Sequence, residues 1–381
     1  MSESDASIVK TVSVDLLAET DPVAELVKAL GDGSYACIIV LASPAVELEH
    51  FTAELQKELD SPHILGARTA GEICDEGYSE HKIVALAFPQ SHFAASARIF
   101  EALDDPDEVA IGREVLALRH DAQAQRHDFK NEFAFLLVDG LSRREDAFVL
   151  NISTALGSTQ LFGGSSGDGL RFERAPVFYN GQVRDKAAIV LVVRSDCRFE
   201  VFREDHFESS EKRLVVTGAI PEKRLVTEIN AEPAAPEYAR IVGIDPNQLS
   251  PFIFASHPIV VSVGDQHHVR AIQRVEENGH LRFFASIDEG MVLTVAKARN
   301  ISEHLKEVLG KLSADREPDL IFACDCILRR LEAEQKQEVI NMSAELRKHR
   351  VVGFSTYGEQ HNMLHVNQTL TGIAIYPPDH E

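Results

Sequence analysis

The sequence VVGFSTYGEQHN, residues Val351–Asn362, joins an apolar strand-like run to a turn with two glycines, two hydroxyl residues, a tyrosine and a glutamate. Two earlier stretches follow the same plan, GARTAGE at Gly66–Glu72 and GGSSGDG at Gly163–Gly169. The second turn has one residue fewer between its glycines than the other two. Glycine allows positive φ angles and a close approach of another backbone. The repetition therefore predicts three similar units in one chain.

Each unit consists of an apolar strand, an amphipathic helix, a second strand, the glycine turn and a returning strand. The strands are short continuous apolar runs, as expected when both faces of a sheet are covered. This repeated β-α-β-turn-β pattern predicts an α/β fold with mixed sheets flanked by helices. The expected first strands are Ala36–Ser43, Glu132–Gly140 and Asp319–Cys326; the helices are Val46–Leu59, Asp146–Leu156 and 329–349; the returning strands are His81–Phe88, 187–193 and Thr369–Pro377.

The region from about residue 195 to residue 289 has a different pattern, with short strand-like runs and turn signals. In VEENGHLRF the Asn-Gly pair favours a type I′ turn and predicts a hairpin. We therefore expect a β-rich insertion in the middle of the chain. A length of 381 residues predicts two domains. We place an N-terminal extension at 1–30, an N-terminal domain at 31–220 and a C-terminal domain at 221–381.

The composition excludes several classes of partner. A formal net charge of −22 argues against binding to nucleic acid or to an anionic membrane surface. The apolar runs are far shorter than a membrane span, and the first residues do not resemble a signal peptide. Five cysteines without a regular framework indicate reduced thiols. We therefore expect a cytoplasmic protein.

Several motifs together resemble a known family. FGGSSGDG followed by VFYNG is similar to the FIST N-terminal domain. The FIST C-terminal domain is similar to the series HPIVVSVGD, VRAIQRVEENG, DEGMVLTVAKA, ACDCILRR, VVGFSTYGE and NQTLTGIAI. The resemblance implies an intracellular sensory protein that binds a small ligand and signals to a kinase, a cyclase or another output module. One subgroup binds haem b, senses nitric oxide and acts on a partner histidine kinase.

The three turns supply the first candidate ligand-binding residues, because ligands of open α/β sheets bind at strand ends. The alternative is that these polar side chains only satisfy local backbone groups of tight turns. The turns lack the spacing of phosphate-binding loops. The candidates are Ser355, Thr356, Tyr357 and Glu359 in the third turn, and Ser165, Ser166 and Asp168 in the second.

The stretch CDCILRR supplies the second set. In a strand, Cys324 and Cys326 point to one face with side chains ~7 Å apart, which suits a soft metal or an iron centre. Arg329 could lower a thiol pKa or pair with a ligand carboxylate. The alternative is that both cysteines are small buried hydrophobes.

His361 and His365, next to the third turn, are the candidate haem ligands, although most histidines of such a protein lie on its surface. The chain lacks an HExxH motif, and we expect a protein that is not an enzyme. The alternative to haem-based sensing is a binding protein for a small polar metabolite such as an amino acid. The sequence is compatible with an oligomer, and a histidine kinase or another output protein is the expected partner.

Overall fold

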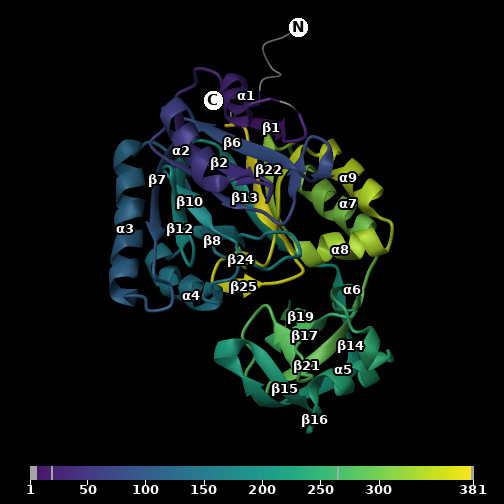
Figure 1. Ribbon diagram of the computed structural model, residues 1–381. Coiled ribbons are helices and arrows are strands. Elements are labelled where there is room, and N and C mark those ends of the chain that lie inside the picture. The colour runs from purple at the N-terminus through teal and green to yellow at the C-terminus, as the bar shows by residue number, and fades with distance from the viewer. Residues whose placement is uncertain (1–6, 19, 264–265, 379–381) are drawn as a thin grey trace.

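A computed structural model describes residues 7–18, 20–263 and 266–378. It confirms the predicted α/β class. A body of three mixed sheets is covered by helices, and a separate β-rich lobe hangs below it in Figure 1. No helix in these described ranges combines the length and the apolar character needed to cross a bilayer.

The three sheets of the body have one strand order. In each sheet a leading strand pairs with the last strand of its unit, followed by the first strand, the second strand and a two-stranded hairpin. The first and second strands are parallel, and the last strand runs antiparallel to the first. The predicted repeat is therefore present in three dimensions, and each unit also contains a leading strand and a helix that precede the predicted segments.

Unit one forms most of sheet 1. Its elements are β1 (Lys10–Asp15), α1 (Pro22–Leu30), β2 (Tyr35–Ala42), α2 (Leu48–Glu58), β3 (Ile64–Arg68), the hairpin β4 (Glu72–Cys74) and β5 (Gly77–Ser79), and β6 (Lys82–Pro89). Unit two forms most of sheet 2. Its elements are β7 (Phe93–Phe100), α3 (Glu108–Gln125), β8 (Asn131–Val138), α4 (Glu145–Leu156), β9 (Gln160–Ser165), the hairpin β10 (Val177–Tyr179) and β11 (Gln182–Arg184), and β12 (Ala188–Ser195).

Unit three forms most of sheet 3. Its elements are β13 (Arg198–Glu204), α7 (Ile301–Leu312), β22 (Leu320–Cys326), α8 (Ile327–Gln335), α9 (Val339–Lys348), β23 (Val351–Thr356), the hairpin β24 (Glu359–His361) and β25 (Leu364–Val366), and β26 (Leu370–Tyr376). The lobe is inserted between β13 and α7. It contains β14 (Phe207–Ile220), β15 (Leu225–Ile229), β16 (Glu232–Pro233), α5 (Ala234–Val242), α6 (Pro251–Ser256), β17 (Ile259–Val263), β18 (Gln266–Val269), β19 (Ile272–Val275), β20 (Leu281–Phe283) and β21 (Val292–Ala298), with two short 3₁₀ turns at Pro221–Lys223 and Pro246–Gln248.

The hairpins are exchanged around the body. The hairpin of unit one pairs with β23 of sheet 3, that of unit three with β9 of sheet 2, and that of unit two with β3 of sheet 1. The exchange closes a cycle of three, so every unit completes the sheet of another unit.

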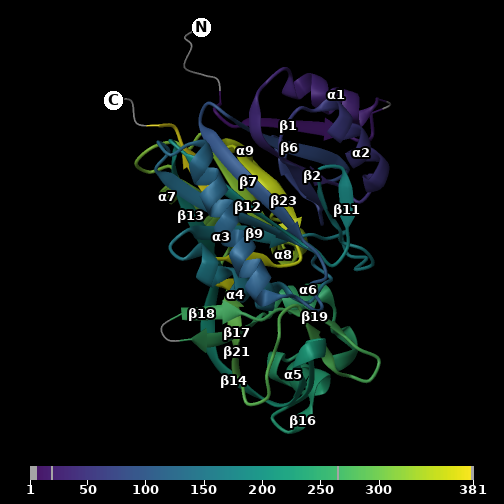
Figure 2. The same ribbon diagram turned by 90° about the vertical axis from the view of Figure 1, so that its left-hand side faces the viewer.

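The inner faces of the three sheets share one apolar core. Phe135, Phe162 and Phe322 meet there, with ring centroids 5.0–5.5 Å apart. The helices cover the outer faces: α1 and α2 pack on sheet 1, α3 and α4 on sheet 2, and α7 and α9 on sheet 3. Figure 2 shows α3 along the outside of β7 and β12. The amphipathic pattern of the helices follows from this single buried face.

One sequence prediction in unit three needs correction. The long helix expected over 329–349 is two helices, because the chain turns at Gln337, which has a φ of 59°. Ile340, an apolar residue of this stretch, is 82% exposed at the start of α9. The hairpin predicted in VEENGHLRF is confirmed by the antiparallel pair β19–β20 with Gly279 at a φ of 78°.

Three equivalent glycines let the second strand of each unit lie against the first. A Cβ at Gly66 would lie 1.8 Å from the Val40 carbonyl oxygen, and at Gly353 it would lie 1.8 Å from that of Ala323. The corresponding distance at Gly163 is 2.2 Å from Leu136. A real Cβ cannot occupy such positions, so the backbone would have to move.

Replacing Gly353 by alanine should therefore lower the free energy of unfolding by about 1–3 kcal/mol, the cost typical of overpacking. Gly310→Ala is the matched control, because Gly310 lies in α7 with open space around its Cβ position. That change should raise stability by about 1 kcal/mol through helix propensity. Chemical denaturation of both variants measures the difference. Equal stabilities would contradict the close approach.

Candidate ligand site where three turns meet

The three glycine turns meet on the pseudo-three-fold axis of the body. A closed ring of backbone hydrogen bonds joins them. The Ala70 amide donates to the Ser355 carbonyl at 3.0 Å, the Gly167 amide to Arg68 at 3.0 Å, and the Tyr357 amide to Ser165 at 3.3 Å. Each bond links equivalent positions of two different units. The turns are therefore a structural junction first.

The first and third turns bury an equivalent Thr–Glu pair. The Thr69 hydroxyl donates to Glu72, and the Thr356 hydroxyl donates to Glu359. Both glutamates are fully buried. Burial raises the pKa of Glu72 to about 7 and that of Glu359 to about 8, although hydrogen bonds from neighbouring groups oppose the shift. Glu359 also accepts the amide of Thr369 at 3.2 Å and its hydroxyl at 2.7 Å.

The second turn departs from this pattern, because Gly169 stands where the other turns have glutamate. Its carboxylate belongs to Asp168, which accepts a hydrogen bond from the Tyr357 hydroxyl. Asp168 also accepts the amides of Phe172, Glu173 and Arg174 at 2.8–3.0 Å. Burial alone would raise the pKa of Asp168, but these donors outweigh it and lower the pKa. An ionised Asp168 thus organises the loop that follows it.

A cavity of about 350 Å³ opens beside the junction, at the carboxyl ends of β2 and β3. Its wall combines acidic and basic side chains from units one and two. Arg171 has no acidic partner among the described residues, and its Nε donates to the Asp168 carbonyl at 3.2 Å. The lining residues are Ser43, Pro44, Ala45, Ala70, Gly71, Glu72, Glu80, His81, Asp168, Gly169 and Arg171. We call this the axial cavity.

The other polar residues predicted in the turns face the interior. Ser165 accepts a hydrogen bond from the Gln360 side chain at 3.0 Å, and the Ser166 hydroxyl donates to the Ala175 carbonyl. Ser355 and Thr356 are fully buried, and Tyr357 is 2% exposed. Of the candidates in the second and third turns, only Asp168 borders the axial cavity.

Cys324 and Cys326 lie in β22 and are both buried. Burial raises the pKa of each thiol well above its usual range. The strand register makes Cys324 the equivalent of Leu41 and Leu137, which share its core. Arg329 is also buried, and it bonds to Asp325 at 2.6 Å and to His206 at 3.0 Å. The structure therefore keeps these three candidates away from the axial cavity.

His361 and His365 lie on opposite strands of the β24–β25 hairpin. Gln360 pairs with His365 and His361 pairs with Leu364, so the two histidines point to opposite faces. The His365 ring is buried, and its Cε1 lies 2.3 Å from where a Cβ of Gly358 would be. His361 borders a groove of about 680 Å³ beside β13.

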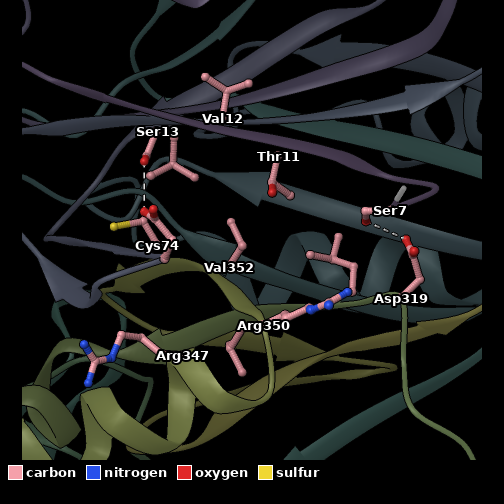
Figure 3. Close-up of a pocket in the computed structure, with 13 residues that line it drawn as sticks. Ser7, Thr11, Val12, Ser13, Cys74, Asp319, Arg347, Arg350 and Val352 are labelled. Atoms are coloured by element: carbon pink, nitrogen blue, oxygen red, sulfur yellow. Dashed lines mark hydrogen bonds between the residues drawn. The ribbon is translucent and has the colours of Figure 1, made fainter. Parts of the chain in front are cut away.

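Another cavity, of about 430 Å³, lies between β1 and the end of α9 (Figure 3). Thr11 and Ser13 face it from β1, and Arg347 and Arg350 rise from the opposite side. Asp319 in its wall is already bonded to the amides of Ile8 and Val9. This cavity lies at the amino ends of β22 and β23, away from the strand ends where ligands of such sheets bind.

Two family models match the chain. The FIST N domain matches residues 36–232, and the FIST C domain matches residues 234–362. The chain belongs to the FIST family. FIST domains are sensory domains of signal transduction, so the resemblance drawn from the motifs is confirmed at this level. A search of curated proteins gave no match.

The motifs of the FIST N domain do not reveal the whole axial cavity. Arg171 and His81 are not among the predicted site residues, and neither are Ser43, the last residue of a predicted strand, and Pro44 and Ala45 that follow it. Arg171 stands three residues after Asp168, which is the one sequence signal that could have drawn attention to it. His81 and Ser43 line the same cavity as Arg171 only because β6 of unit one pairs with β2.

Replacing Glu359 by glutamine should reduce the loss of stability at rising pH. A carboxyl whose pKa is raised from 4.5 to about 8 is protonated in the fold and ionised in the unfolded chain between these values, so ionisation destabilises the fold as pH rises through this window. The slope of unfolding free energy against pH should change by up to ~1.4 kcal/mol per pH unit. Urea unfolding between pH 6 and pH 8 measures it.

Glu277→Gln serves as the control, because Glu277 is exposed in the lobe. Its slope should equal that of the wild type. A Glu359→Gln variant with the wild-type slope would show that Glu359 is ionised in the fold.

Proposed function

We propose that this FIST protein senses a small zwitterionic metabolite of the amino-acid type in the axial cavity. The observation that carries the proposal is that acidic and basic side chains line the same cavity. Glu80 suits an ammonium group, although it also pairs with Arg330 at 2.8 Å, whereas Arg171 and His81 suit a carboxylate. A cavity of about 350 Å³ at the carboxyl ends of parallel strands is of the usual size and place for a small ligand.

The contacts of Asp168 offer a route from the cavity to the lobe. Asp168 holds the loop that carries Phe172, and the Phe172 ring lies 4.6 Å from that of Tyr357. Phe284 of the lobe lies 6.0 Å from Phe172 and 6.3 Å from Tyr357. A ligand that moves Asp168 or Arg171 therefore acts on rings that also touch the lobe. Such differential contact is what a sensory change requires.

The signal goes to a histidine kinase or another output protein. A formal charge of −22 favours a partner with a basic face, because complementary charge speeds association.

A thermal-shift screen of free amino acids and related zwitterions tests the site. A ligand at 100 times its Kd stabilises a fold by about 2.7 kcal/mol, which is measurable as a rise in Tm. Arg171→Ala should weaken binding at least tenfold, because a carboxylate loses its charged donor. Arg113→Ala, at an exposed position of α3, is the matched control and should bind as the wild type. Stabilisation that is equal in Arg171→Ala and the wild type would place the ligand elsewhere.

The groove beside His361 supports a second candidate, haem b with nitric oxide as the sensed gas. Burial, followed by the charge of Arg203, lowers the pKa of His361 to about 4, so its imidazole is neutral at physiological pH, as iron ligation requires. The apolar lining residues of the groove are Val201, Phe202, Met363 and Leu364, and the carboxylates Glu200 and Glu204 line it as well. Arg203 also lines the groove, where it would pair with a propionate, although its guanidinium already contacts His268 at 2.9 Å. His361 would therefore be the residue that binds the haem iron, whereas the tightly packed His365 ring has no room for a cofactor beside it.

Haem iron held by one imidazole keeps a coordination position for a gas. In this groove His361 would supply that imidazole and Arg203 would orient the cofactor. Reconstitution with haemin should give a Soret band in the wild type and in His50→Ala, an exposed control on α2. His361→Ala should shift the band or lower haemin affinity at least tenfold. Absence of a band, or an identical band in His361→Ala, would refute this candidate.

A further inference from the structure

His92, Asp196 and Cys197 gather at the end of the body opposite the axial cavity. The Nδ1 atom of His92 lies 3.1 Å from each carboxylate oxygen of Asp196. The Sγ atom of Cys197 lies 3.6 Å from Asp196 Oδ1, and all the ligand atoms lie within 4.8 Å of one another. None of these residues borders the cavities described above.

The His92–Asp196 and Asp196–Cys197 separations match those between ligands of one tetrahedral metal ion. Zn–N and Zn–O bonds of about 2.0–2.1 Å with a Zn–S bond of about 2.3 Å place N and O about 3.3 Å apart, and O and S about 3.5 Å apart. The observed distances are 3.1 Å and 3.6 Å. One imidazole, one carboxylate and one thiolate are ligands that zinc accepts, with water in the fourth position.

We propose that His92, Asp196 and Cys197 form a binding site for a zinc-class divalent cation. The cation binds His92 Nδ1, one Asp196 oxygen and the Cys197 thiolate. The thiol proton is released to solvent on binding.

Hydrogen bonds from two neighbouring side chains, Ser195 and Asn131, already hold the backbone of His92 and Cys197 in place. The Ser195 hydroxyl donates to the His92 carbonyl at 2.8 Å and accepts the Cys197 amide at 2.9 Å. The Asn131 side chain donates to the Cys197 carbonyl at 2.8 Å. The ligands therefore stand on two tied turns, which is the preorganisation a metal site needs.

The site also has an entry path. The side chains of His92 and Asp196 are 34% and 35% exposed, whereas Cys197 is 1% exposed and forms the inner wall. Arg126 is near enough to Asp196 to interact with its charge and would repel an approaching cation. However, Arg126 is ion-paired with Asp128 at 2.7 Å, and this acidic partner offsets its charge. A hydrated cation can reach the carboxylate and the imidazole before it meets the sulfur.

The position of the triad gives a bound cation a structural consequence. His92 lies where the chain passes from β6 of sheet 1 to β7 of sheet 2, and Asp196 and Cys197 lie where it passes from β12 of sheet 2 to β13 of sheet 3. One ion at this point would fasten both crossings, and therefore all three sheets.

Titration of chelator-treated full-length protein with Co²⁺ tests the site. We expect one Co²⁺ per chain, a thiolate-to-cobalt charge-transfer band, and displacement of that band by Zn²⁺. The band should be lost in Cys197→Ser, and affinity should fall at least tenfold in His92→Ala and Asp196→Asn. These last two positions are partly exposed, so their variants keep the test valid if Cys197→Ser does not fold.

His120→Ala is the matched control, because His120 and Asp121 form an exposed pair 3.9 Å apart on α3 without a cysteine. Its titration should equal that of the wild type. Co²⁺ binding without a thiolate band, or a band that persists unchanged in His92→Ala and Asp196→Asn, would overturn the proposal. In the first case the binding is adventitious binding to surface histidines only.

Discussion

The ring of backbone hydrogen bonds among Ala70, Gly167 and Tyr357 is the constraint on which the body depends, since it joins the three units where their exchanged hairpins depart. Each sheet ends at its second strand unless another unit supplies two more strands. The ring fixes where those strands begin, and the inner core forms only when all three sheets face one another. Folding of the body is therefore cooperative over the whole trio, and the turns must first satisfy this geometry before they can serve a ligand.

The elements could be predicted from the sequence because their signals are local. Apolar runs such as Ala36–Ser43 and the spacing in Glu145–Leu156 carry the information within a dozen residues. The hairpin exchange carries no such signal. Its strands are three residues long, and Glu72–Cys74 pairs with residues near 353, so only tertiary packing decides the partner. Most residues of the axial cavity are likewise far apart in the sequence. Cys324 resembles a metal ligand in the sequence, but the strand register places it at a position equivalent to two leucines.

The departures from three-fold symmetry coincide with the groups that can do chemistry. Glu72 and Glu359 sit in equivalent, closed environments and belong to the architecture, although Glu72 also reaches one wall of the cavity. Asp168 breaks the pattern, organises its own loop and meets Tyr357 across the axis. The lobe breaks it again, because it is inserted in unit three alone and places Phe284 against the same tyrosine. The symmetry of the scaffold is therefore broken: the first and second turns border the cavity and the third does not, and a lobe is present in unit three alone.

The exchanged hairpins also mean that the two FIST modules are interlocked. The N module, residues 36–232, contributes β4–β5 and β13 to sheet 3, whose β22 and β23 belong to the C module, and β24 of the C module pairs with β9 of the N module. A fragment holding only the N module would carry both a hairpin without its partner and the bare edge of β9. Both features present unpaired strand edges, to which strands of another copy can add. In the whole chain these edges are paired internally, because the three units exchange their hairpins in a closed cycle.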